Sequence, residues 1–167
     1  VYLFDFGLAP YFSYATSFQP QVLDPATSLD DKPFKPTTGD QYEAGLRYQY
    51  RKSIYVTFGA YQIKQKNMNT PAPNGEMCGP ATCYVQTGEG RVRGLELEGR
   101  ANLPWDMSVI FTGTRSDPRV TKSNTAYQIG NYLPQAPKWM ASLFVDQRIR
   151  RGTFRGAGVG GGVRYTG

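Results

Sequence analysis

Hydrophobic and polar residues alternate one by one along several stretches of the chain. The clearest stretch runs from residue 94 to residue 101, with Leu95, Leu97, Gly99 and Ala101 on one face and Glu96, Glu98 and Arg100 on the other. A period of two residues predicts a β-strand with one apolar and one charged face. The charged face could point to solvent, as in a soluble sheet, or to the watery lumen of an outer-membrane barrel whose apolar face meets lipid.

Seven stretches of this kind predict strands, and helical periodicity is almost absent. We expect strands at residues 8–18, 41–50, 53–66, 84–103, 107–115, 139–148 and 156–165, with residues 1–4 as the end of an eighth strand. Proline and glycine punctuate the chain between these stretches, as is typical of an all-β protein.

The connections between the predicted strands alternate between short and long. Short turns are expected at residues 5–7, 51–52, 104–106 and 150–154, and long polar loops at residues 19–40, 67–83 and 116–138. Outer-membrane barrels are built in this way, with short periplasmic turns and long extracellular loops. The sequence therefore predicts an antiparallel up-and-down transmembrane β-barrel rather than a Greek-key sandwich.

The composition of the two faces favours the barrel. Residues such as Glu43 and Arg47 make the second faces too charged for the inside of a sandwich, whereas the apolar faces are long enough for strands of about ten residues that cross a membrane. An interfacial aromatic girdle is expected at the short-turn end. Its predicted members are Tyr48, Tyr50, Tyr55 and Trp105.

Two stretches do not fit the simple pattern. Arg91 and Arg93 share the parity of Leu95, so either a bulge at Gly94 reverses the faces or these arginines stand above the membrane beside anionic lipid. In residues 53–66 both parities carry apolar side chains, and the pattern does not assign their faces.

Composition removes several classes of function. The 167 residues contain no apolar run long enough for a transmembrane helix and no histidine. The net charge of +6 comes from scattered basic residues, apart from those at 148–151, with no phosphate-binding motif or basic helix, so we expect no nucleic-acid partner. Catalytic motifs are also missing, and Glu96 and Glu98 are interpreted as charges on a watery wall. We expect no enzyme activity and no metal ligands.

Cys78 and Cys83 are candidates for a disulfide bond. They enclose Gly79 and Pro80, which favour a tight turn, and their spacing is not that of a zinc site. A disulfide at a loop tip would imply an oxidising compartment. The alternative is a pair of free thiols in a reducing one.

Six segments, taken in order, resemble the barrel of TonB-dependent siderophore receptors, in particular ferric hydroxamate receptors of the ferrichrome and ferrioxamine type. They are residues 7–20 (GLAPYFSYATSFQP), 34–48 (FKPTTGDQYEAGLRY), 61–67 (YQIKQKN), 85–98 (VQTGEGRVRGLELE), 137–143 (PKWMASL) and 160–165 (GGGVRY). The resemblance covers essentially the whole chain.

This resemblance implies a barrel of about 22 strands, plugged by an N-terminal domain that follows a TonB box. Residues 1–167 would form about seven of those strands, and the plug domain and the C-terminal closing strands would lie outside them. The implied function is energised uptake of a ferric siderophore across the outer membrane of a Gram-negative bacterium. The implied partners are the siderophore, TonB with ExbB and ExbD, and outer-membrane lipid.

No cofactor is implied, because the siderophore itself would hold the iron. Aromatic side chains line siderophore pockets in this family, and the candidates carried by loops here are Phe34, Tyr84, Tyr127 and Tyr132. Four alternatives remain open at this point: a receptor for another metal chelate, a small eight-stranded barrel with a structural or adhesive role, an outer-membrane enzyme, and a soluble β-protein.

Overall fold

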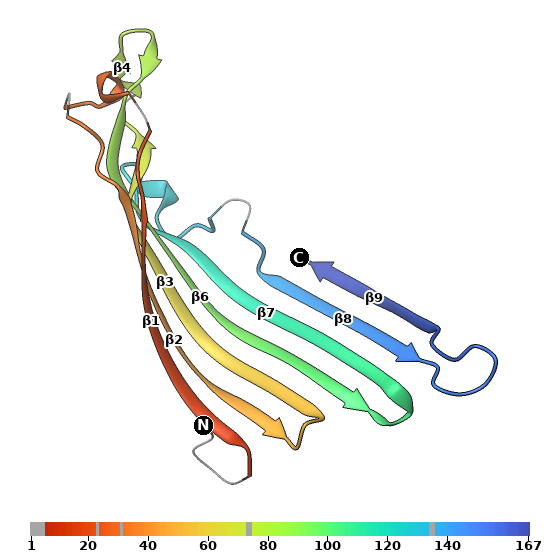
Figure 1. Ribbon diagram of the computed structural model, residues 1–167. Coiled ribbons are helices and arrows are strands. Elements are labelled where there is room, and N and C mark those ends of the chain that lie inside the picture. The colour runs from red at the N-terminus through yellow and green to blue at the C-terminus, as the bar shows by residue number, and fades with distance from the viewer. Residues whose placement is uncertain (1–5, 23, 31, 73–74, 134–135) are drawn as a thin grey trace.

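One broad, curved antiparallel sheet contains nearly all the regular structure of the chain (Figure 1). The computed structural model describes residues 6–22, 24–30, 32–72, 75–133 and 136–167, so the strand end expected at residues 1–4 lies outside the described residues. The seven strands of the sheet are β1 (Leu8–Gln19), β2 (Thr37–Tyr50), β3 (Ile54–Pro71), β6 (Tyr84–Leu103), β7 (Met107–Lys122), β8 (Trp139–Arg148) and β9 (Gly158–Thr166).

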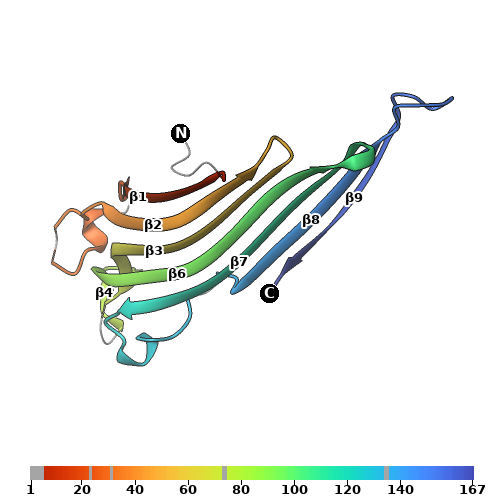
Figure 2. The same cartoon turned by 90° about the horizontal axis from the view of Figure 1, so that it is seen from below.

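The strands pair in the order β1-β2-β3-β6-β7-β8-β9, which confirms the predicted up-and-down topology. Seen from below, they lie side by side in an arc with β1 and β9 at its two edges (Figure 2). The remaining elements are small: the hairpin of β4 (Met77–Cys78) and β5 (Ala81–Thr82), and the 3-10 turns η1 (Pro25–Thr27), η3 (Pro104–Asp106) and η4 (Ala126–Gln128). Within the described residues, no helix has the length and apolar character needed to cross a membrane.

The predicted bounds of β6 and β8 agree with the structure, and those of β1 and β9 differ by one or two residues at an end. Three strands are longer than predicted: β2 begins at Thr37, β3 continues to Pro71 and β7 continues to Lys122. The two long loops expected after β3 and β7 are therefore shorter, because both strands extend well beyond the part of the sheet that β8 and β9 cover (Figure 1).

The extension of β7 contains Pro118, which makes the segment resemble a loop in sequence. Proline is tolerated in a strand that has lost one neighbour. The pairing of β7 with β8 ends at Arg115, opposite Trp139, and beyond it the residues around 130–133 approach β7 instead, with the Leu133 N–H donating to the Pro118 carbonyl at 3.1 Å. Pro118 therefore lies where no regular strand pairs on that side.

The extension of β3 contains an irregularity at Asn67. The register with β6 shifts between Gln65 and Met68, and Asn67 has a positive φ of 58°. Asparagine adopts this left-handed conformation more readily than most residues. Its side chain donates to the Pro36 carbonyl at 3.1 Å, which ties the turned backbone to the loop that precedes β2.

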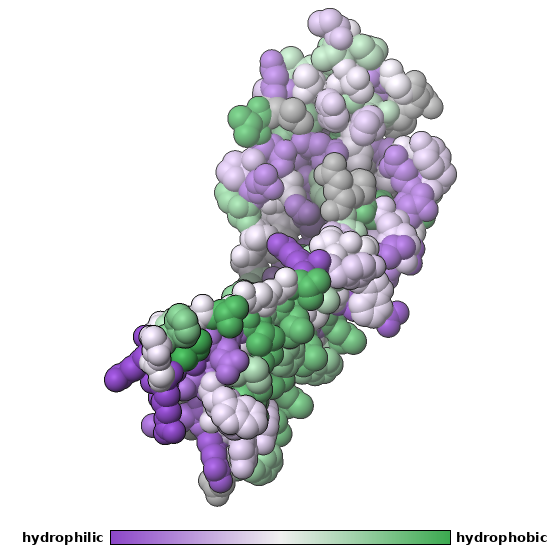
Figure 3. Space-filling view, turned by 90° about the vertical axis from the view of Figure 1, so that its right-hand side faces the viewer, coloured by the Kyte–Doolittle hydropathy of each residue, from purple (hydrophilic) through white to green (hydrophobic). Residues whose placement is uncertain are grey.

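One face of the sheet is apolar and uncovered. Strand pairing places Leu46, Phe58 and Leu97 side by side across β2, β3 and β6, and their side chains are 45%, 46% and 42% exposed. The same face continues across β7 to β9 with Phe111, Leu143 and Val163. Hydrophobic side chains gather over the lower half of the molecule, and the loop end is largely polar (Figure 3). A soluble monomer rarely exposes an apolar surface of this extent, whereas lipid would cover it.

The register resolves the stretches that the sequence left open. In β3, Ile54, Val56, Phe58 and Ala60 share the apolar face, because they pair with Tyr50, Tyr48, Leu46 and Ala44 of β2. No register shift occurs at Gly94, since pairing with both neighbours is continuous from residue 90 to residue 101. A bulge therefore does not explain Arg91 and Arg93, which lie on the apolar face above its last leucine, Leu95.

One member of the predicted aromatic girdle lies on the wrong face. Tyr48 and Tyr50 share the parity of Leu46, and Trp105 is at the tip of the turn between β6 and β7. Tyr55 pairs with Gln49 and Arg100, which places it on the polar face. The prediction was wrong because composition at one end of a strand does not reveal side-chain parity.

Candidate binding surfaces of the barrel wall

The polar face carries two tyrosines that lie flat against the sheet. A Cβ atom at Gly45 would clash with the Phe58 carbonyl oxygen and approach the Tyr11 ring to 2.6 Å, and one at Gly59 would approach the Tyr11 hydroxyl to 2.7 Å. Only glycine leaves room for the ring at these two positions. The Tyr11 hydroxyl donates to Glu43 at 2.5 Å, and the guanidinium of Arg47 stacks over the ring at 4.4 Å.

Tyr61 repeats this arrangement over Gly94, where an added Cβ atom would lie 2.5 Å from the ring. Around the two tyrosines the face is charged: Glu43 pairs with Tyr61, and Glu96 pairs with Gly59. Glu98 follows on the same side of β6. This face therefore offers hydroxyls, carboxylates and guanidinium groups to a watery space.

Above the apolar band, a polar network joins the loop before β2 to the ends of β3 and β6 nearest the long loops. The side chain of Gln86 bonds reciprocally with the backbone of Lys35, with both distances 2.6 Å. Gln21 donates to the hydroxyl of Thr37 at 2.5 Å and accepts from Asn69 at 2.8 Å. The contacts of Gln86 with Lys35 and of Gln21 with Asn69 hold loop residues against strands that are 51 and 48 positions away in sequence.

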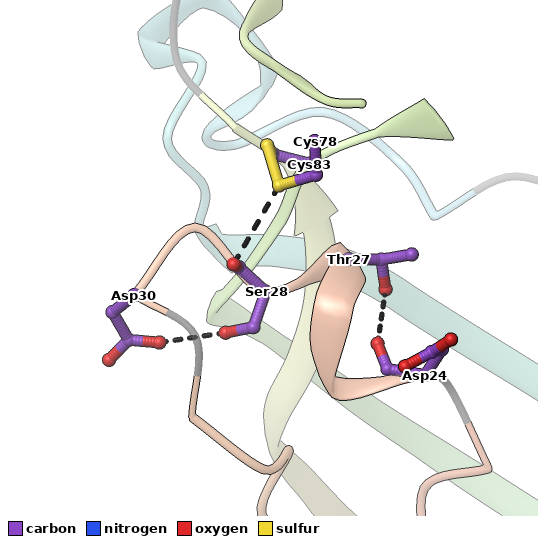
Figure 4. The surroundings of a disulfide bond; sticks show 6 residues. All are labelled: Asp24, Thr27, Ser28, Asp30, Cys78 and Cys83. Carbon is purple, nitrogen blue, oxygen red and sulfur yellow. Dashed lines mark hydrogen bonds between the residues drawn. A yellow bond between two sulfur atoms is a disulfide. The ribbon is translucent and has the colours of Figure 1, made fainter. Parts of the chain in front are cut away.

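A disulfide closes the β4–β5 hairpin at the loop end (Figure 4). The Sγ atoms of Cys78 and Cys83 are bonded at 2.06 Å, and Cys83 is buried. The hairpin lies against the first loop, because Cys78 Sγ is 3.7 Å from the carbonyl oxygen of Ser28 and the Leu29 N–H donates to the Tyr84 carbonyl at 3.1 Å. The disulfide thus fixes a hairpin to which the η1 loop is attached.

We predict that both cysteines are oxidised in the protein as isolated from its native cells. Alkylation without a reductant should then add no mass at Cys78 or Cys83, and alkylation after reduction should add two groups. Cys78→Ser with Cys83→Ser should increase proteolytic cleavage within residues 70–84 while leaving the β6–β9 region resistant, because the hairpin lies outside the main sheet. Free thiols in the native protein would contradict this prediction.

The four predicted ligand-contacting aromatics do not form one cluster. Phe34 and Tyr84 belong to adjoining segments, because Gln86, two residues after Tyr84, holds the backbone of Lys35. Tyr127 lies on η4 with 79% of its surface exposed. Tyr132 lies elsewhere, beside β7, where an isolated bridge pairs it with Arg119.

Tyr132 borders an open hollow of about 920 Å³ at the upper edge of the apolar face. Lys138 Nζ lies 3.5 Å and Arg119 Cζ 3.7 Å from the centre of its ring. Arg93 and Arg115 line the same hollow, and Arg115 stacks on Trp139 at 5.0 Å. Four cations against the two carboxylates of Glu43 and Asp117 give a net positive surface suited to an anionic group at the border between lipid and water.

The sequence pointed to part of this hollow and missed the rest. The parity of Arg91 and Arg93 left two explanations open, and the continuous register excludes the bulge at Gly94 and leaves both arginines on the apolar face beyond Leu95. Arg115 and Arg119 lie in a stretch interpreted as strand end and loop, and Lys138 comes from the far end of that loop. Only the register of β7 against β6, which pairs Arg91 with Arg119 and Leu95 with Arg115, brings them to one place.

An ion cluster links β3, β6 and β7 just above this hollow. Glu89 accepts from Lys122 at 2.8 Å and lies 3.2 Å from Lys64 Nζ, and its side chain is 14% exposed. The hydrogen bond from Lys122, reinforced by Lys64, holds the pKa of the Glu89 carboxyl below its usual range.

Acidification should therefore loosen this cluster. Because the pKa of Glu89 is lowered in the folded state, its stabilisation is present above about pH 4 and is lost as the pH falls through the lowered pKa. Hydrogen exchange of the full-length protein, corrected for intrinsic rates, should show lost protection at residues 88–91 and 119–122 in acid. Glu89→Gln should show that loss already at pH 7, and Glu76→Gln, at an exposed loop position, should not. Equal protection in the Glu89→Gln variant at pH 7 would refute the assignment.

The comparisons with known proteins agree over the whole chain. A family model described as TonB dependent receptor-like, beta-barrel matches residues 1–167. The ferrichrome outer membrane transporter/phage receptor of Escherichia coli K12 is 38% identical, over 99% of this chain and 21% of that protein. The ferrioxamine B receptor of Salmonella typhimurium LT2 is 32% identical, over 99% and 22%.

Solved structures show the same fold. The ferripyoverdine receptor of Pseudomonas aeruginosa superimposes with a TM-score of 0.77 at 20% identity, covering 96% of this chain and 21% of that one. The chain thus spans about a fifth of the length of these relatives. Its sheet, its two unlike faces and its match from end to end lead to one assignment: the chain belongs to the β-barrel family of TonB-dependent receptors.

Proposed function

We propose that the protein to which these residues belong lies in the outer membrane and takes up a ferric siderophore in a TonB-dependent manner. The observation that carries this proposal is the match of the entire chain to the receptor barrel family, with named relatives for ferrichrome and ferrioxamine at 38% and 32% identity. The apolar outer face and the charged inner face support it, since an arc of this kind suits a water-filled barrel in lipid.

The proposed substrate class is a ferric hydroxamate, because both of these relatives are named for such ligands. The siderophore would carry the iron in chelated form, so the wall has only to bind the outside of the complex. Aromatic side chains at the loop end and the hydroxyls and amides of the polar network provide contacts of the right kind.

The proposed mechanism is transport without covalent chemistry. A plug domain would face the charged inner wall formed by Glu43, Glu96 and Glu98, and TonB would act on that plug using the inner-membrane proton gradient. Carboxylates gathered in a confined lumen favour a partner surface that brings cations and hydrogen-bond donors.

The proposal is tested by uptake in the native bacterium. Deletion of the gene should abolish accumulation of radioactive iron supplied as ferrichrome or ferrioxamine, and loss of TonB should have the same effect. Complementation with the gene should restore uptake. A further relative, the metal-pseudopaline receptor of Pseudomonas aeruginosa, is 31% identical and points to another metal chelate as the alternative substrate. If deletion left hydroxamate uptake unchanged and abolished accumulation of such a chelate, the proposed substrate class would be replaced.

Two aromatic residues of the loop end give a sharper test. Tyr127→Ala together with Tyr132→Ala should weaken binding of the ferric complex to the purified receptor, by about five-fold for each ring that contacts it. The single variants separate the exposed Tyr127 from Tyr132, which the structure places between Arg119 and Lys138. Affinity that is unchanged in the double variant would exclude both residues from the pocket.

A further inference from the structure

The turn between β8 and β9 is the most basic segment of the chain. Four arginines occur within eight residues: Arg148, Arg150, Arg151 and Arg155. All four are exposed, and the turn lies at the end of the sheet opposite the long loops (Figure 1). The described residues give one of them a carboxylate partner, since Arg150 Nε lies 2.7 Å from Asp106 Oδ1.

Large apolar side chains stand exposed among these cations. Phe154 is 73% exposed and Ile149 is 40% exposed within the turn, and Trp105 of the neighbouring turn η3 is 80% exposed. The two turns are joined, because Gln147 donates to the Trp105 carbonyl at 3.4 Å and Arg150 pairs with Asp106. We call this surface the turn anchor: Trp105, Ile149, Arg150, Arg151, Phe154 and Arg155. Arg148 is left out, because the register of β8 places it on the polar face with Ser142.

The backbone of the turn anchor is held in place by its own hydrogen bonds. The Ile149 N–H donates to the Ala157 carbonyl at 2.9 Å, and the Gly156 N–H donates back to Ile149 at 2.8 Å. Arg155 donates to Gly152 at 3.2 Å, and positive φ angles at Gly152 and Gly156 permit this path. The arginines therefore project from a defined turn, which lowers the entropy lost when they bind a ligand.

The turn anchor lies directly below the apolar face. Val159 and Val163 of β9 belong to that face and are 70% and 66% exposed, and the turn follows them at the end of the sheet. In a membrane, the side chains of this turn would lie at the interface between acyl chains and headgroups, where aromatic rings and long basic side chains are both stabilised. Short turns of outer-membrane barrels face the periplasm, so the nearest lipids are those of the inner leaflet.

We propose that the turn anchor binds the phosphate group of anionic phospholipid in the periplasmic leaflet. Arg151 and Arg155 provide planar guanidinium groups that can grip phosphate oxygens in pairs, and Phe154 and Trp105 insert beside the acyl chains. Asp106 neutralises Arg150 alone, and the net positive charge that remains on Arg151 and Arg155 selects an anionic headgroup over a zwitterionic one. The site rests on the outer-membrane location and is independent of the siderophore.

The test is lipid retention by the purified full-length receptor. The receptor is placed in nanodiscs of phosphatidylethanolamine with a minor fraction of phosphatidylglycerol and then released into mild detergent. Native mass spectrometry measures which lipids stay bound to it. Wild-type protein should keep phosphatidylglycerol above its share in the disc. Arg151→Gln with Arg155→Gln should reduce its apparent affinity by about five-fold for each arginine, or about 25-fold together.

A matched variant separates the site from net charge. Lys32→Gln with Lys35→Gln removes two charges at the opposite end of the molecule and should leave retention unchanged, whereas Phe154→Ser, which keeps every charge, should weaken it. Equal retention by wild type and the arginine variant, or equal loss in the lysine control, would overturn the proposal. Retention of phosphatidylethanolamine to the same degree would also overturn it. The measurement uses neither siderophore nor TonB, so its failure leaves the proposed uptake untouched.

Discussion

A polypeptide of these 167 residues alone is expected to stay outside lipid vesicles. The sheet has two edge strands, β1 with 12 residues and β9 with nine, and neither pairs on its outer side within the described chain. Each unpaired backbone group costs several kcal/mol in hydrocarbon, which is why membrane-spanning sheets close into barrels. The two edges together present enough such groups to outweigh the gain from an apolar face of seven strands.

Refolding from urea into vesicles measures this directly. The isolated chain should remain sensitive to protease, while the full-length receptor under the same conditions should become resistant. A protease-protected monomer of the isolated chain, rich in β-structure, would show that seven strands suffice and would remove the argument from edge pairing.

The second large effect concerns Leu97 on the lipid-facing side. Leu97 lies on the apolar face of β6 opposite Phe58, which has apolar neighbours on both sides along β3, and is 42% exposed. An arginine at the midplane of a membrane barrel costs about 2–4 kcal/mol, because its charge must leave water or distort the bilayer. Leu97→Arg should therefore lower the free energy of unfolding of the receptor by that amount, as measured by denaturant titration in vesicles.

The control is an arginine introduced on the neighbouring strand β7, on the polar face of the sheet. Thr112 of β7 pairs with Glu98 and lies on the polar side. Thr112→Arg brings a guanidinium beside a carboxylate in the lumen and should change the free energy of unfolding by less than about 1 kcal/mol. If both variants lost stability equally, the assignment of lipid and lumen to the two faces would be wrong.

The alternation of residues predicted the topology because a sheet with one buried or lipid-covered face leaves a period of two in every strand. The bounds of β6 and β8 were predicted correctly because turn residues flank both strands. The extensions of β3 and β7 were missed, since Pro118 and the polar run that ends at Pro71 have loop composition. Their strand conformation comes from pairing partners far away in sequence, which propensity does not contain.

The candidate surfaces were predictable only in part. Parity within one strand showed that Arg91 and Arg93 share the face of Leu95, but only pairing with both neighbours excluded a bulge at Gly94. Predicting the hollow at Tyr132 would have required the register of β6 against β7 and the position of Lys138 beside it. The roles of Gly45 and Gly59 were hidden as well, because a glycine in a strand pattern does not say which ring lies across it.

Gly45, Gly59 and Gly94 affect the inner width of the barrel. The rings of Tyr11 and Tyr61 lie parallel to the sheet, so these two large side chains extend only a short distance toward the barrel axis. A side chain at Gly45, Gly59 or Gly94 would lift a ring upright and move the inner surface toward the axis by roughly the width of a phenol. The inner width of a barrel built with this wall therefore depends on the absence of a side chain at Gly45, Gly59 and Gly94.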